Sequence, residues 1–174
     1  MKRRFYIGVD PGASGAVAIF DPQADFMEVW DMPGEKSGNR DRNRASGRGL
    51  AGIFHEYGPQ TLMALVEEVG SMPQQGVVST FNFGFSTGVL HGVLAATYTP
   101  FKTITPVTWK NAMGVSADKN SSIRQAMRLF PEHGEWLTSV PKTRAHNRAE
   151  AMLLAHLAAK DRRGPVSALD KFLL

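Results

Sequence analysis

The 174-residue sequence contains no cysteine, so disulfide bonds and thiolate metal sites are both excluded. It also has no uninterrupted apolar run of transmembrane length, and its first apolar segment is too short for a signal peptide. We therefore expect a cytoplasmic protein with no membrane partner. Acidic residues are outnumbered, with 16 Asp and Glu against 20 Lys and Arg, which permits a polyanionic partner without establishing one.

The remaining composition is ordinary for a globular protein. Hydrophobic residues make up 43% of the chain and charged residues 21%. At this length we expect one domain spanning residues 1–174, large enough to bury most of the surface that its unfolded chain exposes.

The chain opens with two apolar runs, Phe5–Val9 and Ala16–Phe20, separated by the segment DPGASG. β-branched and aromatic residues bounded by Pro and Gly predict a hairpin, with Met27–Met32 as a third antiparallel strand. Asp10 lies where the first strand ends, and a carboxylate there is costly to bury unpaired. Asp10 is therefore either a turn residue or the ligand of a cation.

A second acid follows another predicted strand. Thr61–Val69 is nearly continuously apolar, which is typical of a buried parallel strand and makes the predicted sheet mixed and the class α/β. Glu67 follows five apolar residues, so it lies near the carboxyl end of that strand, where open α/β sheets place their sites. Phe101–Pro106 is predicted as a further strand.

Residues 34–49 are rich in Gly, Ser, Asn and Arg and precede a short predicted helix at Leu50–Tyr57. The cations in this basic segment are Lys36, Arg40, Arg42, Arg44 and Arg48. Such a segment is either a solvated loop or a flexible arm that grips phosphates.

Helical spacing of apolar residues predicts a helix over Phe81–Ala96, with glycines every four residues that form one smooth face. Phe81 and Phe85 in this helix either pack in the core, line a helix–helix dimer interface or stack on bases. A later helix is expected to begin at Pro106 behind a Thr105 cap, and another is expected to be capped by Asp118.

An Ala- and Leu-rich helix is predicted over His146–Ala159. His146, Asn147 and Glu150 share the face of its first turn, because residues four apart are neighbours on a helix. His146 is there either a structural residue or a metal ligand.

In order, and over nearly the whole chain, these segments resemble RuvC-type Holliday junction resolvases, the phage and bacterial RuvC-like branch of the ribonuclease H-like superfamily. The residues that carry the resemblance are Ile7–Ala16, Glu67–Val69 with Met72–Gly76, Ser79–Gly84, Thr105–Pro106 with Trp109–Lys110, Lys119 with Leu129–Pro131, and Arg148–Ala151. The resemblance implies a ribonuclease H-like fold with a mixed five-stranded sheet flanked by helices. It also implies a homodimer that cuts four-way DNA junctions symmetrically.

Particular roles follow from the resemblance. Asp10, Glu67 and Glu150 match the metal-binding acids of the family, and Lys110 matches a basic residue near the scissile phosphate. Such acids can hold two Mg²⁺ or Mn²⁺ ions about 4 Å apart, one activating water and one stabilising the leaving oxygen. The expected contacts to DNA are Ser79, Thr80 and Lys119, together with the basic segment.

Two departures from the family pattern concern the site. The family usually has a fourth acid, or in some members a histidine, one turn before the last carboxylate. Here His146 is the expected fourth ligand, or else Asn147 or Ala145 stands where an aspartate was, by divergence or by deliberate inactivation. Some relatives also place a junction-wedging aromatic residue just after the strand of Glu67, where this chain has Gly70.

Two other functions are weighed against the resolvase. A catalytically silent DNA-binding relative would keep the basic surface without a complete acid set. An actin-like ATPase or sugar kinase can share the pattern Asp-x-Gly-x-Ser-Gly, but it needs a second phosphate loop and a second domain, for which this chain is too short.

Overall fold

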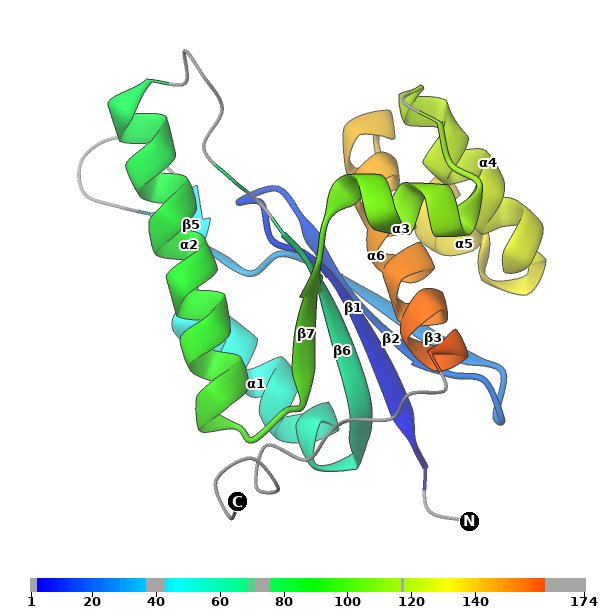
Figure 1. Cartoon of the computed structure of the whole chain (residues 1–174), viewed down its shortest axis with the longest axis horizontal. Coiled ribbons are helices and arrows are strands. Elements are labelled where there is room, and N and C mark those ends of the chain that lie inside the picture. The colour runs from blue at the N-terminus through cyan, green and yellow to red at the C-terminus, as the bar shows by residue number, and fades with distance from the viewer. Residues whose placement is uncertain (1–2, 37–42, 69, 71–75, 117, 162–174) are drawn as a thin grey trace.

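Five strands form one mixed sheet in the order β3-β2-β1-β6-β7 in the computed structural model, which describes residues 3–36, 43–68, 70, 76–116 and 118–161 (Figure 1). The strands are β1 (Phe5–Asp10), β2 (Ala16–Asp21), β3 (Phe26–Asp31), β6 (Thr61–Glu67) and β7 (Phe101–Ile104). β1, β2 and β3 are antiparallel, whereas β6 and β7 run parallel to β1. The predicted mixed five-stranded sheet is confirmed.

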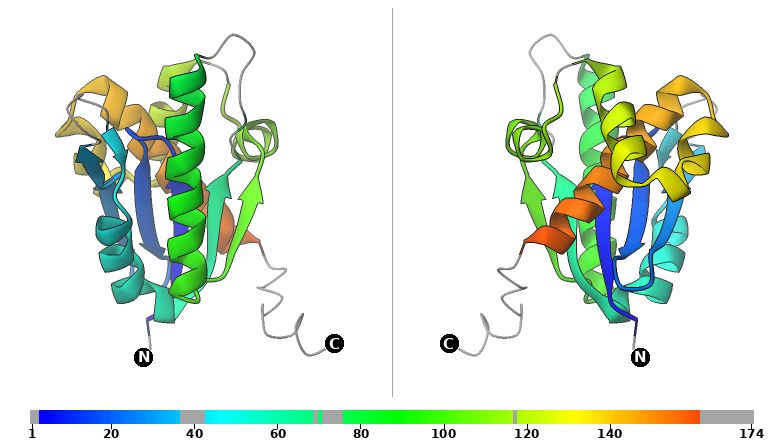
Figure 2. Two further views of the ribbon diagram at one scale, coloured as in Figure 1. Left: turned by 90° about the vertical axis from the view of Figure 1, so that its left-hand side faces the viewer. Right: turned by 90° about the vertical axis from the view of Figure 1, so that its right-hand side faces the viewer.

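Helices cover both faces of this sheet, as the two side views in Figure 2 show. One face is covered by α1 (Gly47–Tyr57) and α2 (Val77–Ala96), with η1 (Gly58–Gln60) after α1. The opposite face is covered by α3 (Pro106–Met113), α4 (Lys119–Leu129), η2 (Pro131–His133), α5 (Glu135–Thr138) and α6 (Lys142–Lys160). The sheet therefore lies between two hydrophobic cores.

Helices α3 and α4 each begin directly after a capping residue. The Thr105 hydroxyl accepts a hydrogen bond from the backbone N–H of Thr108, and Asp118 accepts one from Asn120, so both predicted caps are confirmed. α6 begins at Lys142, one turn earlier than predicted, because its polar first turn follows Pro141 and offers no apolar periodicity. His146 therefore lies beyond the first turn, which corrects its predicted place.

The helix α2 attaches to the sheet through one face only. Its Ser86, Leu90 and Leu94 are buried, whereas Phe81 and Phe85 are 62% and 38% exposed. The core interpretation of these two phenylalanines is therefore wrong, because the helix is apolar nearly all round and periodicity does not show which side faces the sheet.

By length and composition alone, α2 is the one helix in the described part of the chain that could span a membrane. This corrects the expectation that no segment reaches such a length. The same composition also occurs in helices of soluble proteins, so it is weak evidence for a span.

The described residues of the basic segment include β4 (Gly34–Lys36) and β5 (Asn43–Ala45), which pair as a two-stranded antiparallel sheet. Its second strand is fixed to α2. The backbone N–H of Ala45 donates to Ser86 Oγ at 3.1 Å, and Arg44 Nε donates to Asn82 Oδ1 at 2.9 Å. Arg44 is therefore held against α2 and is neither a solvated loop residue nor part of a flexible arm. Its role in binding DNA stays a prediction. Arg40 and Arg42 lie outside the described residues.

Candidate active site

Three carboxylates lie at the carboxyl edge of the sheet, and we refer to Asp10, Glu67 and Glu150 as the acid cluster. Val9 of β1 pairs with Val66 of β6, so the register places the next residues, Asp10 and Glu67, side by side. The third carboxylate, Glu150, comes from α6, which packs across β1. Glu67 and Glu150 are 9% and 5% exposed, so the acids lie in a largely water-excluded position.

The surroundings of Asp10 disfavour its charged form. Burial, followed by the charges of Glu67 and Glu150, raises the pKa of Asp10 from 3.8 to about 7. The backbone N–H of Gly12 donates to Asp10 Oδ1 at 3.5 Å, and this bond and Lys110 offset only part of the effect. A turn residue in water would not have this environment. A bound cation would stabilise the charged form of Asp10 and so lower its pKa.

Glu67 is held by a residue whose role the sequence did not indicate. The fully buried Trp109 of α3 donates from its indole Nε1 to Glu67 Oε1 at 2.8 Å. Burial raises the pKa of Glu67 above its ordinary value, although the bond from Trp109 acts in the opposite direction. A buried tryptophan needs a hydrogen-bond acceptor, and this requirement was the available signal.

Glu150 has three polar neighbours around one carboxylate oxygen. Lys110 Nζ lies 2.9 Å from Glu150 Oε1, Ser122 Oγ donates to the same atom at 3.1 Å, and His146 Nε2 lies at 3.4 Å. His146 was predicted to lie beside this carboxylate, and it does. Lys110 was predicted near the scissile phosphate, and its contact with Glu150 was not predicted. Ser122, which has less than 2% of its surface exposed, was not predicted.

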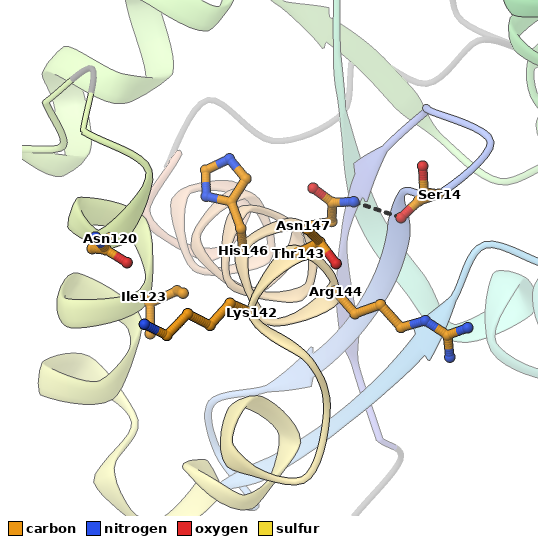
Figure 3. A pocket seen from close by; sticks show the side chains of 8 residues that line it. All are labelled: Ser14, Asn120, Ile123, Lys142, Thr143, Arg144, His146 and Asn147. Carbon is orange, nitrogen blue, oxygen red and sulfur yellow. Dashed lines mark hydrogen bonds between the residues drawn. The ribbon is translucent and has the colours of Figure 1, made fainter.

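Asn147 lies next to His146 in sequence but points elsewhere (Figure 3). Its amide Nδ2 donates to the backbone carbonyl oxygen of Ser14 at 2.6 Å, which joins α6 to the turn between β1 and β2. In this arrangement Asn147 supports the turn that follows Asp10. A role for Asn147 or His146 as a metal ligand stays a prediction.

Asp31 is a further carboxylate at the same edge of the sheet, and no role for it was predicted from the sequence. Asp31 ends β3 and accepts hydrogen bonds from Arg148 Nε at 2.7 Å and Arg144 Nη1 at 3.1 Å. The bond from Arg148 is the main reason that the pKa of Asp31 is lowered, so Asp31 stays charged. Arg148 also donates to the carbonyl oxygen of Trp136. This network ties α6 to β3, and its members are too far apart in sequence to be paired by inspection.

The donor chemistry of the acid cluster fits a divalent metal ion. Carboxylates are hard oxygen ligands of the kind that Mg²⁺ and Mn²⁺ prefer. Burial, and then the charges of Glu67 and Glu150, raise the pKa of Asp10, and Lys110 offsets only part of this effect. Among the described residues, however, no three His, Asp or Glu side chains are grouped closely enough to hold a metal ion. Glu67 and Glu150 are instead engaged by Trp109 and Lys110.

The predicted DNA contacts come from several elements. Lys36 is exposed on β4 and Arg48 is exposed on α1. Ser79 and Thr80 lie in the first turn of α2, where Thr80 Oγ1 donates to the carbonyl oxygen of Gly76. Lys119 opens α4, and its side chain is outside the described part. Their roles in binding DNA stay predictions.

The sheet order and the helices on both faces define a ribonuclease H-like fold. Among solved structures, the chain is similar to Thermus thermophilus RuvC. In complex with a Holliday junction substrate, that protein matches with a TM-score of 0.60 at 13% identity, over 91% of this chain and 97% of RuvC. A second Thermus thermophilus RuvC structure matches with a TM-score of 0.57 at 14% identity over the same shares. No protein-family model and no curated protein sequence matches the chain.

Proposed function

We propose that the chain is a divalent-metal-dependent endonuclease that cuts four-way DNA junctions. One observation carries the proposal: the adjacent ends of β1 and β6 carry Asp10 and Glu67, and α6 carries Glu150, which has Lys110 beside it and adds to the negative charge around Asp10. Support comes from the fold, because the similar RuvC structure was solved with a Holliday junction substrate.

The acids and their neighbours have distinct roles in this proposal. Asp10, Glu67 and Glu150 would hold two Mg²⁺ or Mn²⁺ ions, which supply an activated water and stabilisation of the leaving oxygen when bound. Trp109 fixes the orientation of Glu67 through its indole N–H. Lys110 lies beside Glu150 and provides a positive charge close to where the scissile phosphate would sit. His146 is the proposed fourth ligand.

Symmetric cutting requires two active sites related by a two-fold axis, and α2 offers the surface for a second copy. Val77, Val78 and Phe81 are exposed on it, with Val77 84% exposed. A Cβ atom added at Gly84, Gly88 or Gly92 would meet nothing within 4 Å, so this side of α2 is uncovered. We propose that two copies pack α2 against α2.

A junction-binding protein without cleavage is the second candidate. It is favoured by Asn147, whose amide stands near where the family has a carboxylate and is hydrogen-bonded to the Ser14 carbonyl. An amide supplies an oxygen without charge, so metal affinity would be lower.

A synthetic four-way junction, compared with a linear duplex of the same arm sequence, tests the proposal. We expect paired, symmetric nicks in the junction with Mg²⁺ or Mn²⁺, no product with EDTA and no product from the duplex. Tight junction binding without any nicking would favour the silent protein. Equal cutting of duplex and junction would contradict structure selectivity.

A further inference from the structure

A cavity of about 540 Å³ opens beside the acid cluster, around the first turn of α6 (Figure 3). Its polar lining includes Ser14, Asn120, Lys142, Arg144, His146 and Asn147. No carboxylate from the residues that the structure describes lines this cavity, and two of the lining side chains are cations. A cavity with this lining favours an anion.

The charge of these two cations is only partly neutralised. Arg144 shares the single carboxylate of Asp31 with Arg148, so the three groups together keep one net positive charge. Arg148 is the more buried partner and makes the shorter contact, whereas the Arg144 side chain is 61% exposed. Lys142 is exposed, and none of the ion pairs found among the described residues includes it.

A neighbouring cavity lies against the turn between β1 and β2. This second cavity, of about 350 Å³, shares Ser14 and Arg144 with the first and extends to Lys36 and Glu35 of β4. It is also lined by Asp31, the carboxylate that pairs with Arg144. In Figure 3, Lys142 extends toward α4 whereas Arg144 extends to the other side of the helix. We refer to these two neighbouring cavities together as the groove at the start of α6.

This groove adjoins the acid cluster. His146 lines the first cavity, and its Nε2 atom lies 3.4 Å from Glu150 Oε1. A DNA strand whose scissile phosphate lies at Glu150 would therefore have its neighbouring phosphates within reach of the groove. In addition, the N-cap residue of α6, Pro141, makes no side-chain hydrogen bond to the first turn, and helix N-termini of this kind attract anions.

We infer that the groove binds the phosphates next to the scissile one on the strand that is cut, with Lys142 and Arg144 as the contacts. The inference rests on the proposed function, because it names where the substrate of that same site runs. It assigns a DNA-binding role to residues outside the basic segment and outside α2. A strand held on both sides of the cut is fixed in position relative to Lys110 and the acids.

The test measures the affinity of Lys142→Ala for the four-way junction at several salt concentrations, in the absence of divalent metal. Lys160→Ala is the matched control. Lys160 is an exposed lysine at the other end of α6, about 27 Å away along the helix axis. Log affinity falls as log salt rises. We expect Lys142→Ala to make this negative slope shallower by about 1, and Lys160→Ala to leave it unchanged. Arg144→Ala should act in the same direction as Lys142→Ala.

Single neutral methylphosphonate linkages, placed one to three nucleotides on either side of the cut, locate the contact. At one position we expect the neutral linkage to weaken junction binding by the wild type. The same linkage should not weaken binding by Lys142→Ala any further, because this variant has already lost the contact. If the wild type binds and cuts the junction but no position couples to Lys142, and the salt slopes of the two lysine variants agree, this inference is overturned while the proposed function stands. If the wild type does not bind the junction, both are overturned.

Discussion

Gly8 of β1 lies directly against the backbone of α6, such that a Cβ atom at this position would be 2.0 Å from the carbonyl oxygen of Ala151. This close approach holds the residue before Ala151, Glu150, beside the end of β1 where Asp10 stands. The acid cluster therefore depends on a glycine that contributes no chemistry of its own.

Replacing this glycine should damage fold and site together. We expect Gly8→Ala to lower the free energy of unfolding by about 2 kcal/mol or more, because the added methyl group overlaps backbone atoms that have little freedom to move. Gly52→Ala in α1 is the control, since nothing lies within 4 Å of its Cβ position and alanine favours a helix. Urea denaturation measures both. Equal stability of the two variants would contradict the close packing of β1 and α6.

The pH dependence of stability should report on Asp10. Its pKa is raised from 3.8 to about 7 in the fold, so the folded state binds a proton more tightly than the unfolded state. In EDTA, stability should therefore fall as pH rises from about 4 to about 7, and Asp10→Asn should remove this part of the dependence. Mg²⁺ should raise the melting temperature of the wild type at pH 8 more than that of Asp10→Asn. The same metal-induced shift in both proteins would contradict the ligand role of Asp10.

Disrupting the exposed side of α2 should separate a dimer. We expect Phe81→Glu to yield monomers in analytical ultracentrifugation and to abolish paired cutting, because it places a charge in the proposed apolar interface. Val107→Glu is the control, since Val107 is an equally apolar residue, 71% exposed, on α3. A wild type that is monomeric while cutting junctions symmetrically would refute the α2 interface.

His146 and Asn147 give opposite expectations at the start of α6. His146→Ala should reduce cleavage strongly, because its imidazole adjoins Glu150. Asn147→Asp should give no faster enzyme and should destabilise the turn by about 1 kcal/mol or more, since a carboxylate would face the Ser14 carbonyl oxygen without a hydrogen to donate. Single-turnover cleavage and thermal unfolding measure these effects. A large gain in rate from Asn147→Asp would show that Asn147 replaces a catalytic acid.

Much of the sheet and two of its acids were predictable because each depends on local pattern. The apolar runs before Asp10 and Glu67 predicted strands, and parallel pairing of those strands brings both acids to one edge. The role of Glu150 was predicted from the family resemblance and from helical spacing. In each of these cases, residues close in sequence carry the information.

The remaining features depend on contacts between distant segments. The bond from Trp109 to Glu67 joins residues 42 positions apart, and the pairing of Arg148 with Asp31 spans 117 positions. The exposed side of α2 was unpredictable for another reason: its apolar residues surround the helix, so the sequence does not distinguish the face on the sheet from the face left open.

The most direct measurement compares junction cleavage by Glu67→Gln and Glu68→Gln in Mg²⁺. The two residues are neighbours with the same side chain, but Glu67 is buried against Trp109 in the acid cluster, whereas Glu68 is exposed. We predict that Glu67→Gln binds the junction and loses at least about 100-fold in cleavage rate, as expected for loss of a metal-binding charge, while Glu68→Gln cuts like the wild type. Near-normal cleavage by Glu67→Gln would contradict the proposal that these carboxylates form the active site.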